Sequence, residues 1–404
     1  MSDYTRTLLP IRWPAGAPKS SYDVVIIGGG GHGLSTAYHL ATRHGITNVA
    51  VLEAEYIASG NTGRNTTIIR ANYGIPEAIR FYQHSLELYQ GLEAETGAAI
   101  LHQTKGIIWL AHTEMAMRAE RARCAMNEAV GAQTFMRTPA ELKELIPQLD
   151  LTGGGRYPVL GGSHHVQGAT ARHDRVAWAY AAGASQRGVD LFQHSAVTGL
   201  RLDGDRVVGV ETRSGPIAAG VVLSAAGGRV AQVAAMAGVR LPVRTHPLHA
   251  FVTNDHAPGF PIILASTELA CYVSQTDRGQ MLIGAEFDAQ PSYSRQSSFA
   301  ALRSYSYKIT RLLPFLRDLR ILRTWAGSCD ISADYSPIMG ATGVDGFLVT
   351  TGWGTWGFKA IPAGGEGMAE LIATGRPPAL IAPFGLDRFR RDHVLADAGS
   401  AGTR

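Results

Sequence analysis

Residues 23–53 read DVVIIGGGGHGLSTAYHLATRHGITNVAVLE, and this stretch decides the fold. The apolar run at 24–27 is typical of a central parallel strand. Residues 34–41 keep one helical face apolar, and residues 49–52 form a second apolar run. The stretch therefore predicts a strand, a glycine turn, a helix and a second strand, which together open a Rossmann-like sheet.

Three glycines in the turn, Gly28, Gly30 and Gly33, have the spacing GxGxxG. The first permits the tight turn, the second lets the backbone approach a pyrophosphate, and the third allows the helix to pack closely on the strand. Glu53 follows the second strand, where a carboxylate can accept hydrogen bonds from both ribose hydroxyls. An acid at this place argues against a ligand with a 2′-phosphate. The pattern predicts a dinucleotide site and leaves NAD and FAD open.

The composition limits the kinds of function. The chain has 404 residues, too many for one ordinary core, and 45% are hydrophobic and 17% charged, as in a globular protein. The net charge of +4 is spread along the chain, which argues against nucleic-acid binding, and no apolar run is long enough to span a bilayer. We expect a cytoplasmic protein with no membrane contact, no metal site and three free buried thiols, Cys124, Cys271 and Cys329.

Beyond the first unit, helical and strand-like segments alternate. Residues 197–212 predict a hairpin, and a short strand follows at 221–223. A meander of this kind is common in FAD-binding Rossmann domains and rare in NAD dehydrogenases, which favours a flavin. Residues 246–288 predict an antiparallel sheet that builds a substrate wall. We expect helices near 76–96, 114–130, 140–145, 297–313 and 363–374.

The predicted fold class is α/β, with a discontinuous FAD-binding Rossmann-like domain that contains a β-meander and an α+β substrate domain on an antiparallel sheet. The expected segments of the FAD-binding domain are residues 21–82, 155–230 and 322–390. Those of the substrate or cap domain are residues 83–154 and 231–321. An N-terminal arm at 1–20 and a C-terminal tail at 391–404 complete the chain.

Four motifs together resemble one family. They are VVIIGGGGHG at 24–33, RNTTIIRANY at 64–73, TARHDRVAWAY at 170–180 and GWGTWGFKAIP at 352–362. Nearly the whole chain resembles the β subunit of heterotetrameric sarcosine oxidase, in the glycine oxidase and D-amino-acid oxidase group of flavoproteins. The resemblance implies oxidation of sarcosine to glycine, with formaldehyde or methylenetetrahydrofolate as second product. Electrons would pass from FAD to FMN and then to O2, which gives hydrogen peroxide.

The resemblance also implies where a non-covalent FAD binds. The first turn and the ribose contacts map onto the three glycines together with Gly31, His32 and Glu53. Val197 maps onto the main-chain contact with the adenine. The loop past the pyrophosphate and the flavin ring maps onto Asn61, Arg64, Asn65, Thr66 and Ile68, and the second glycine loop onto Gly354, Gly357 and Lys359.

A second flavin, FMN, is implied by the resemblance as a covalent adduct of His173. Read alone, this histidine, between Arg172 and the expected helix N-cap Asp174, is more typical of a capped surface residue. Imidazole nevertheless has the nucleophilic nitrogen that a flavin 8α link requires, and Arg172 could neutralise the FMN phosphate. The same resemblance implies partner α, γ and δ subunits, with NAD and tetrahydrofolate on a partner subunit.

Substrate binding is assigned to two cations that match the family, Arg70 and Lys359. Arg suits a bidentate grip on the carboxylate of a small N-methyl amino acid, and Lys suits a point charge. A solvated Arg70 is the alternative interpretation. The sequence departs from the family at Trp356, at Ile361 and at Ala270 with Cys271, which we expect around the substrate side of the flavin.

These departures leave alternatives open. One is a flavin subunit of N-methylglutamate dehydrogenase, which acts on a longer substrate and uses an acceptor other than O2. Another is a flavoprotein subunit that only carries electrons or scaffolds its partners. A third is a pyridine-nucleotide dehydrogenase, against which the second glycine loop argues.

Overall fold

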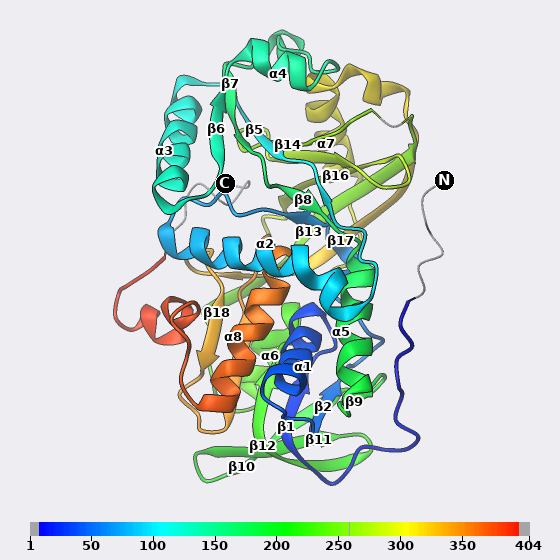
Figure 1. The fold of residues 1–404 in the computed structure, drawn as a ribbon, viewed down its shortest axis with the longest axis vertical. Coiled ribbons are helices and arrows are strands. Elements are labelled where there is room, and N and C mark those ends of the chain that lie inside the picture. Colours follow the sequence, from blue (N-terminus) through cyan, green and yellow to red (C-terminus); the bar gives the residue numbers. More distant parts are fainter. Residues whose placement is uncertain (1–7, 258, 396–404) are drawn as a thin grey trace.

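The computed structural model describes residues 8–257 and 259–395, apart from the side chains of residues 285 and 286. Two large sheets lie toward opposite ends of the molecule, and α2 (Pro76–Thr96) crosses between them (Figure 1). A small three-stranded sheet has the order β3-β8-β4. Its strands are β3 (Ile68–Ile69), β8 (Ala169–Thr170) and β4 (Gln103–Thr104).

The first large sheet contains the predicted nucleotide-binding unit. Its main path runs β10-β11-β12-β1-β2-β9, and β19 pairs in parallel with β12. The strands β9, β2, β1, β12 and β19 pair in parallel in this spatial order, so their carboxyl ends lie at one edge of the sheet. The strands are β1 (Ser21–Ile27), β2 (Val49–Leu52), β9 (Asp190–Phe192), β10 (Val197–Asp203), β11 (Arg206–Thr212), β12 (Gly215–Ser224), β18 (Ile338–Ala341) and β19 (Phe347–Thr351).

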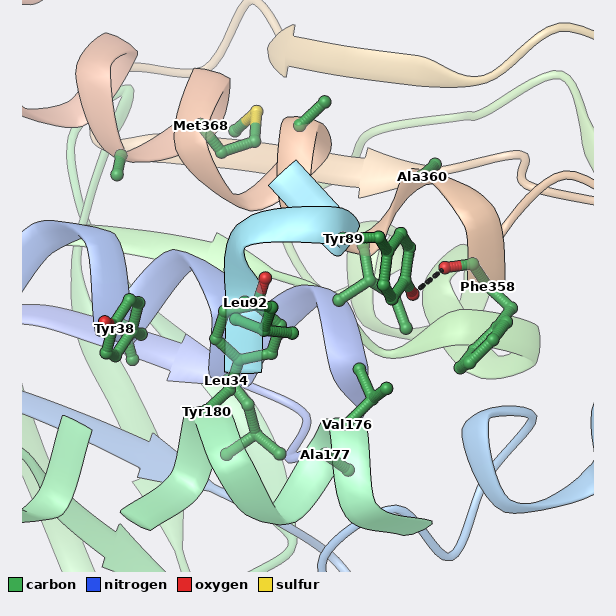
Figure 2. Close-up of a cluster of buried hydrophobic side chains, with 14 of the residues drawn as sticks. Leu34, Tyr38, Tyr89, Leu92, Val176, Ala177, Tyr180, Phe358, Ala360 and Met368 are labelled. Carbon is green, nitrogen blue, oxygen red and sulfur yellow. Dashed lines mark hydrogen bonds between the residues drawn. The ribbon is translucent and has the colours of Figure 1, made fainter. Parts of the chain in front are cut away.

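Three helices cover one face of this sheet: α1 (Gly31–Arg43), α5 (His173–Gln186) and α8 (Ile361–Thr374) (Figure 1). Figure 2 shows Leu34 of α1 and Tyr180 of α5 in the same core as Leu92 of α2. Helices α1 and α8 approach each other closely at Gly365 of α8, because a Cβ there would lie 2.1 Å from the Ser35 Oγ of α1. On the opposite face lies α6 (Val230–Ala235).

The second large sheet has the order β17-β13-β16-β15-β14-β5-β7-β6. Helix α7 (Phe299–Leu312) packs its apolar side on one core of this sheet. Two more helices, α3 (Glu114–Val130) and α4 (Pro139–Leu145), lie beside β6 and β7. The strands are β5 (Ile107–Ala111), β6 (Thr134–Arg137), β7 (Gly161–His165), β13 (Val243–Asp255), β14 (Ile263–Ser266), β15 (Cys271–Gln275), β16 (Gln280–Phe287) and β17 (Ile321–Ser332).

The predicted fold class is confirmed, down to the meander β10-β11-β12. The second sheet differs from the prediction in being mixed rather than wholly antiparallel, because β5 and β14 pair in parallel. The domain boundaries stay a prediction. β7 and β17 lie in segments assigned to the FAD-binding domain, but both strands pair within the second sheet. The predicted N-cap of α5 is wrong, because the helix begins at His173 with Arg172 as N-cap. None of the described helices is long and apolar enough to cross a membrane.

The predicted arm is visible from residue 8 onward. It lies along α5, where the indole of Trp178 donates to the Leu9 carbonyl and the Arg12 amide donates to Ser185 Oγ. Residues 1–7 of the arm and residues 396–404 of the predicted tail lie outside the described residues. The described part of the arm therefore contacts its own chain.

We expect Gly365→Ala to destabilise the protein by about 1–3 kcal/mol, as overpacking does, because the new Cβ meets the backbone of Ser35 and not only its side chain. The matched control is Gly91→Ala on α2, where an added Cβ meets no described atom within 4 Å. This control should gain about 0.5–1 kcal/mol from helix propensity. Urea unfolding of both variants measures the difference. Equal stability of the two would show that the α1–α8 contact adapts without cost.

Candidate functional site

One cavity of about 510 Å³ lies between the two large sheets. Its floor is the carboxyl edge of the parallel strands, where Ile27, Leu52 and Ala225 line it, and its far wall comes from β5, β14 and β15. Ligands of open α/β sheets bind outside the carboxyl ends of the strands. The cavity has the usual position and a usual size for a small-molecule site.

The first glycine turn forms one wall as predicted. Gly28 has φ +112°, and a Cβ there would lie 2.5 Å from the Ala225 carbonyl oxygen. Gly30 is the N-cap of α1 and has no side chain to cap it. The Gly31 amide donates to the Thr62 hydroxyl at 2.9 Å, and the next amides of the first turn are available to an anion. Gly33 does not line the cavity formed by the described residues. It packs against β1, where a Cβ would lie 2.1 Å from the Gly28 oxygen.

Glu53 lies at the end of β2 and lines the cavity. Its carboxylate accepts hydrogen bonds from the Gly29 amide at 2.8 Å and from the Glu55 amide at 2.9 Å. The Ser195 amide donates to the Glu53 carbonyl at 2.7 Å, which brings Val197 to the same end of the cavity. The backbone thus orients the carboxylate that is predicted to bind the ribose.

The loop after Glu53 lines the cavity with every residue assigned to it. Arg64 donates to the Gly60 carbonyl at 2.9 Å, and Asn61 donates to the Ser328 carbonyl. Burial lowers the pKa of Arg64, and the nearby positive charge of Arg295 adds to this. Thr66 donates to the Tyr272 hydroxyl at 2.8 Å, which joins the loop to the second sheet. Two further residues of the loop, Asn65 and Ile68, complete this wall.

His32 connects the first glycine turn to the second. Its Nε2–H donates to the Gly357 carbonyl at 3.0 Å, and its ring stacks on Trp353 with centroids 4.0 Å apart. Burial lowers the pKa of His32 to about 3, so the imidazole is neutral. The second loop is held from behind by Asp330, which accepts from the Thr351 hydroxyl and the Gly352 amide, each at 2.8 Å. Gly354 and Gly357 of this loop line the cavity.

Four buried polar atoms of cavity-lining residues have no hydrogen-bond partner among the described residues. Buried polar groups in folded proteins are almost always paired, so these four indicate a ligand with donors and acceptors of its own. With the glycine turns and Glu53, they fit a flavin nucleotide. The atoms are His32 Nδ1, Trp109 Nε1, Thr350 Oγ1 and Trp353 Nε1.

Arg70 and Lys359 both line the cavity and are only 4% and 7% exposed, so the alternative of a solvated Arg70 is wrong. The Arg70 guanidinium donates to the Asn72 carbonyl at 2.9 Å and lies over the rings of Tyr73 and Trp109. The Lys359 ammonium donates to the Thr355 carbonyl at 2.8 Å. Burial, and next the charge of Arg70, hold the pKa of Lys359 well below its usual range.

Arg172 and His173 lie at the start of α5 and do not line the cavity formed by the described residues. Both are half-buried. Arg172 pairs with Asp174 at 2.9 Å and approaches Asp277 at 3.7 Å. Burial lowers the pKa of His173, whose Nδ1 has no hydrogen-bond partner within the described chain.

Several lining residues have no sequence motif that marks them. Trp109 and Tyr272 come from plain apolar strands, and Asp330 lies in a segment that reads only as a glycine-rich end. Asp330 could have been found because it lies between Cys329 and Ile331 within a strand, and a charged residue is rarely buried there unless it is paired.

The departures from the family pattern were expected around the substrate, and for most of them this is wrong. Of these four residues, Ile361 alone lines the cavity that the described part of the chain forms, where it packs against Gly31. Trp356 is buried behind the cavity against Tyr73 and Tyr82. Ala270 and Cys271 are buried outside the cavity wall that the described residues form.

The Rossmann-like sheet with its meander, the two glycine loops and the cavity between them define a nucleotide-binding flavoprotein. Residues 23–371 match the family model described as DAO, FAD dependent oxidoreductase, and the chain belongs to this family.

Curated relatives agree with this assignment. The chain is 40% identical to sarcosine oxidase subunit beta of Rhodobacter capsulatus, over 96% of this chain and 94% of that protein. It is 41% identical to the subunit of the same name from Arthrobacter sp, with 96% of each covered. The resemblance predicted from the motifs is therefore confirmed.

Solved structures share the fold. The L-proline dehydrogenase of P. horikoshii matches with a TM-score of 0.88 at 28% identity, over 93% of this chain and all of that one. Glycine oxidase from Bacillus cereus matches with a TM-score of 0.78 at 22% identity, over 89% of this chain and 97% of that one.

We expect Glu53→Gln to weaken FAD binding about ten-fold or more, because a charge-assisted hydrogen bond to a ligand is worth about 1.5–3 kcal/mol. Reconstitution of the apoprotein with FAD, followed by flavin fluorescence, gives the dissociation constant. Glu128→Gln, on the exposed side of α3, is the control. An unchanged dissociation constant in Glu53→Gln would remove the ribose role from this residue.

Proposed function

We propose that the chain is the FAD-bearing catalytic subunit of a sarcosine-oxidase-type complex. It oxidises the N-methyl carbon of sarcosine or of another small secondary amino acid. The observation that carries this proposal is the pair of buried cations, Arg70 and Lys359, on the wall of the cavity. FAD, when bound, supplies the acceptor for the two electrons that leave the substrate.

A carboxylate is the ligand that such a pair of cations binds best. The planar guanidinium of Arg70 is oriented by Asn72 and by the rings of Tyr73 and Trp109, and so is preorganised for two parallel hydrogen bonds. Lys359 is costly to charge in its buried position, and an anion beside it offsets that cost. Binding of the carboxylate therefore orients the substrate and stabilises charged Lys359 in the same event.

The apolar part of the wall supports the rest of the proposal. Ile68, Ile107 and Ala265 lie together next to Trp109 and make this part of the cavity wall apolar. Such a surface suits the methyl group of an N-methyl amino acid. Holding the substrate in a fixed orientation against the bound flavin contributes several kcal/mol to the reaction of the two.

The pair of cations binds sarcosine and N-methylglutamate alike through the α-carboxylate. The family assignment and the names of the curated relatives favour sarcosine. We also propose O2 as the final electron acceptor, which the word oxidase in the names of those relatives favours, and formaldehyde or methylenetetrahydrofolate as the second product. A subunit that only carries electrons would not need two buried cations at its cavity.

His173 is proposed as the attachment site of a covalent FMN. Its imidazole is half-buried outside the FAD cavity, and its Nδ1 has no described partner. Arg172 beside it supplies positive charge for a phosphate, although Asp174 and Asp277 share that charge. Bound there, an FMN would accept electrons outside the substrate cavity.

The names of the curated relatives, subunit beta, imply other subunits of a complex. We propose α, γ and δ subunits as partners of this chain, with NAD and tetrahydrofolate bound on a partner subunit. The proposed location is the cytoplasm.

Anaerobic mixing with substrate tests the catalytic proposal. Sarcosine should bleach the flavin absorbance of the wild-type complex faster than N-methylglutamate does. We expect Arg70→Met and Lys359→Met each to slow bleaching at low substrate about 10- to 100-fold, because each removes a charge-assisted hydrogen bond. Arg121→Met, exposed on α3, is the control. Normal kinetics in both cavity variants would contradict the carboxylate assignment, and bleaching by N-methylglutamate alone would change the substrate.

Acid precipitation tests the FMN proposal. His173→Ala should lose the flavin that stays with the precipitated wild-type protein, while FAD remains extractable, because alanine has no nitrogen to hold the link. Flavin that still precipitates with the variant would place the attachment elsewhere. His44→Ala, a change of another half-buried histidine, should keep the acid-stable flavin.

A further inference from the structure

A buried polar cluster lies behind Arg70, on the side of α3 that faces the second sheet. Glu120, Arg123 and Asn127 are 4%, 5% and 0% exposed, whereas their neighbour Arg121 is exposed. The three residues recur at helical spacing, which places them on one face of α3. Charged residues are rarely buried without a specific partner, so this face has a role that packing alone does not explain.

The ion pair within this cluster is fixed to the sheet beneath it. Arg123 lies 3.1 Å from the Glu120 carboxylate, and each side chain is 5% exposed. Glu120 also accepts a hydrogen bond from the hydroxyl of Ser163. Ser163 of β7 is the cross-strand neighbour of Trp109 in β5, so the pair is anchored directly beside that indole.

Trp109 connects the cluster to the substrate cavity. The Arg123 guanidinium lies over its ring at 5.3 Å from the centroid, and the Arg70 guanidinium lies over the same ring at 5.1 Å. Trp109 itself lines the cavity. Arginine stacks face-on against aromatic rings, so the plane of the indole limits the orientations that the Arg70 guanidinium can take.

The backbone of Arg70 is held by the same face of α3. Asn127 donates to the Tyr73 carbonyl at 2.7 Å and accepts from the Thr134 hydroxyl at 3.1 Å. His165, which lies 3.2 Å from that hydroxyl, accepts from the Ala71 amide at 3.3 Å. Residues 70–73 are therefore bonded from behind at two points, while the ring of Trp109 supports the side chain.

We propose that Glu120 and Arg123 are positioning residues that act through Trp109 on Arg70, and so set the affinity of the cavity for a carboxylate. This inference rests on the proposed function of Arg70. The Glu120–Arg123 pair holds the indole, and the indole holds the guanidinium plane in the orientation that a two-pronged carboxylate contact needs. Glu120 and Arg123 do not line the cavity formed by the described residues, and they reach it through Trp109 and Arg70. Because Arg70 is assigned to carboxylate binding, the cluster acts on binding rather than on the electron transfer itself.

Arg123→Lys is the variant that tests this proposal. It keeps the charge beside Glu120, and with it the fold, but removes the planar group that stacks on Trp109. The probe is acetate, a carboxylate with no amine to oxidise, titrated into the FAD-loaded full chain with its subunits while the flavin spectrum is followed. We expect the acetate dissociation constant to rise about 3- to 10-fold, in the range of coupling through contacting side chains. The limiting rate of flavin reduction at saturating substrate should stay within two-fold of the wild-type rate.

Arg121→Lys, the same change on the exposed face of α3, is the matched control and should bind acetate as the wild type does. Wild-type affinity in Arg123→Lys would overturn the proposal. So would an equal fall in affinity and limiting rate, which would indicate general damage to the site. If acetate does not perturb the wild-type flavin at all, it is the function proposed for Arg70 that fails, and the two failures are thereby distinguished.

A double-mutant cycle provides a second measurement. Trp109→Phe weakens the platform under both guanidinium groups, so Arg123→Lys should cost less acetate affinity in that background than in the wild type. Additive losses in the cycle would show that Arg123 does not act through Trp109.

Discussion

The close contact between α1 and α8 is the constraint on which the cavity depends. Gly365 lets the two helices approach until Ser35 occupies the space of its missing side chain. At the cavity end of this contact, His32 donates to Gly357, a residue 325 positions away in the sequence. Burial keeps the imidazole neutral, with Nε2–H as the donor and the Gly357 carbonyl as the acceptor of this hydrogen bond. The two glycine loops are therefore fixed relative to each other, and a nucleotide that fits one loop must also fit the other.

The other half of the site is an electrostatic arrangement. Arg70 and Lys359 are withdrawn from water, carbonyl oxygens accept hydrogen bonds from both, and two aromatic rings lie against the Arg70 guanidinium. These groups orient the two cations. A site of this kind is preorganised, since the dipoles are already in place before the anion arrives and need not rearrange. The free-energy cost of burying these charges is seen in the low pKa of Lys359. The cluster beside Trp109 adds a further buried charge, Arg123, which is paired with Glu120.

Local signals predicted the elements, and distant contacts limited the prediction of the site. The bounds of α2 and α3 agree with the sequence expectation because their ends are marked locally, by Pro76, Thr113 and left-handed glycines at 97 and 131. The glycine turn and Glu53 were predictable for the same reason. Trp109 and Tyr272 were not, because only the pairing of remote strands brings them to the cavity. Trp356 shows the converse, since a motif gives the position of a residue along the chain but not the direction of its side chain.

The order of strands has a consequence for how the chain can be made and handled. The first sheet takes strands from both ends and from the middle of the chain, and the second takes its strands, β17 included, from the two intervals between them. The polypeptide passes back and forth between the sheets, so neither sheet is complete until the last third of the chain has been synthesised. Such long-range pairing slows folding and lengthens the time that unpaired edges are exposed. Neither sheet corresponds to one continuous segment of the chain, so neither can be expressed as a single uninterrupted fragment.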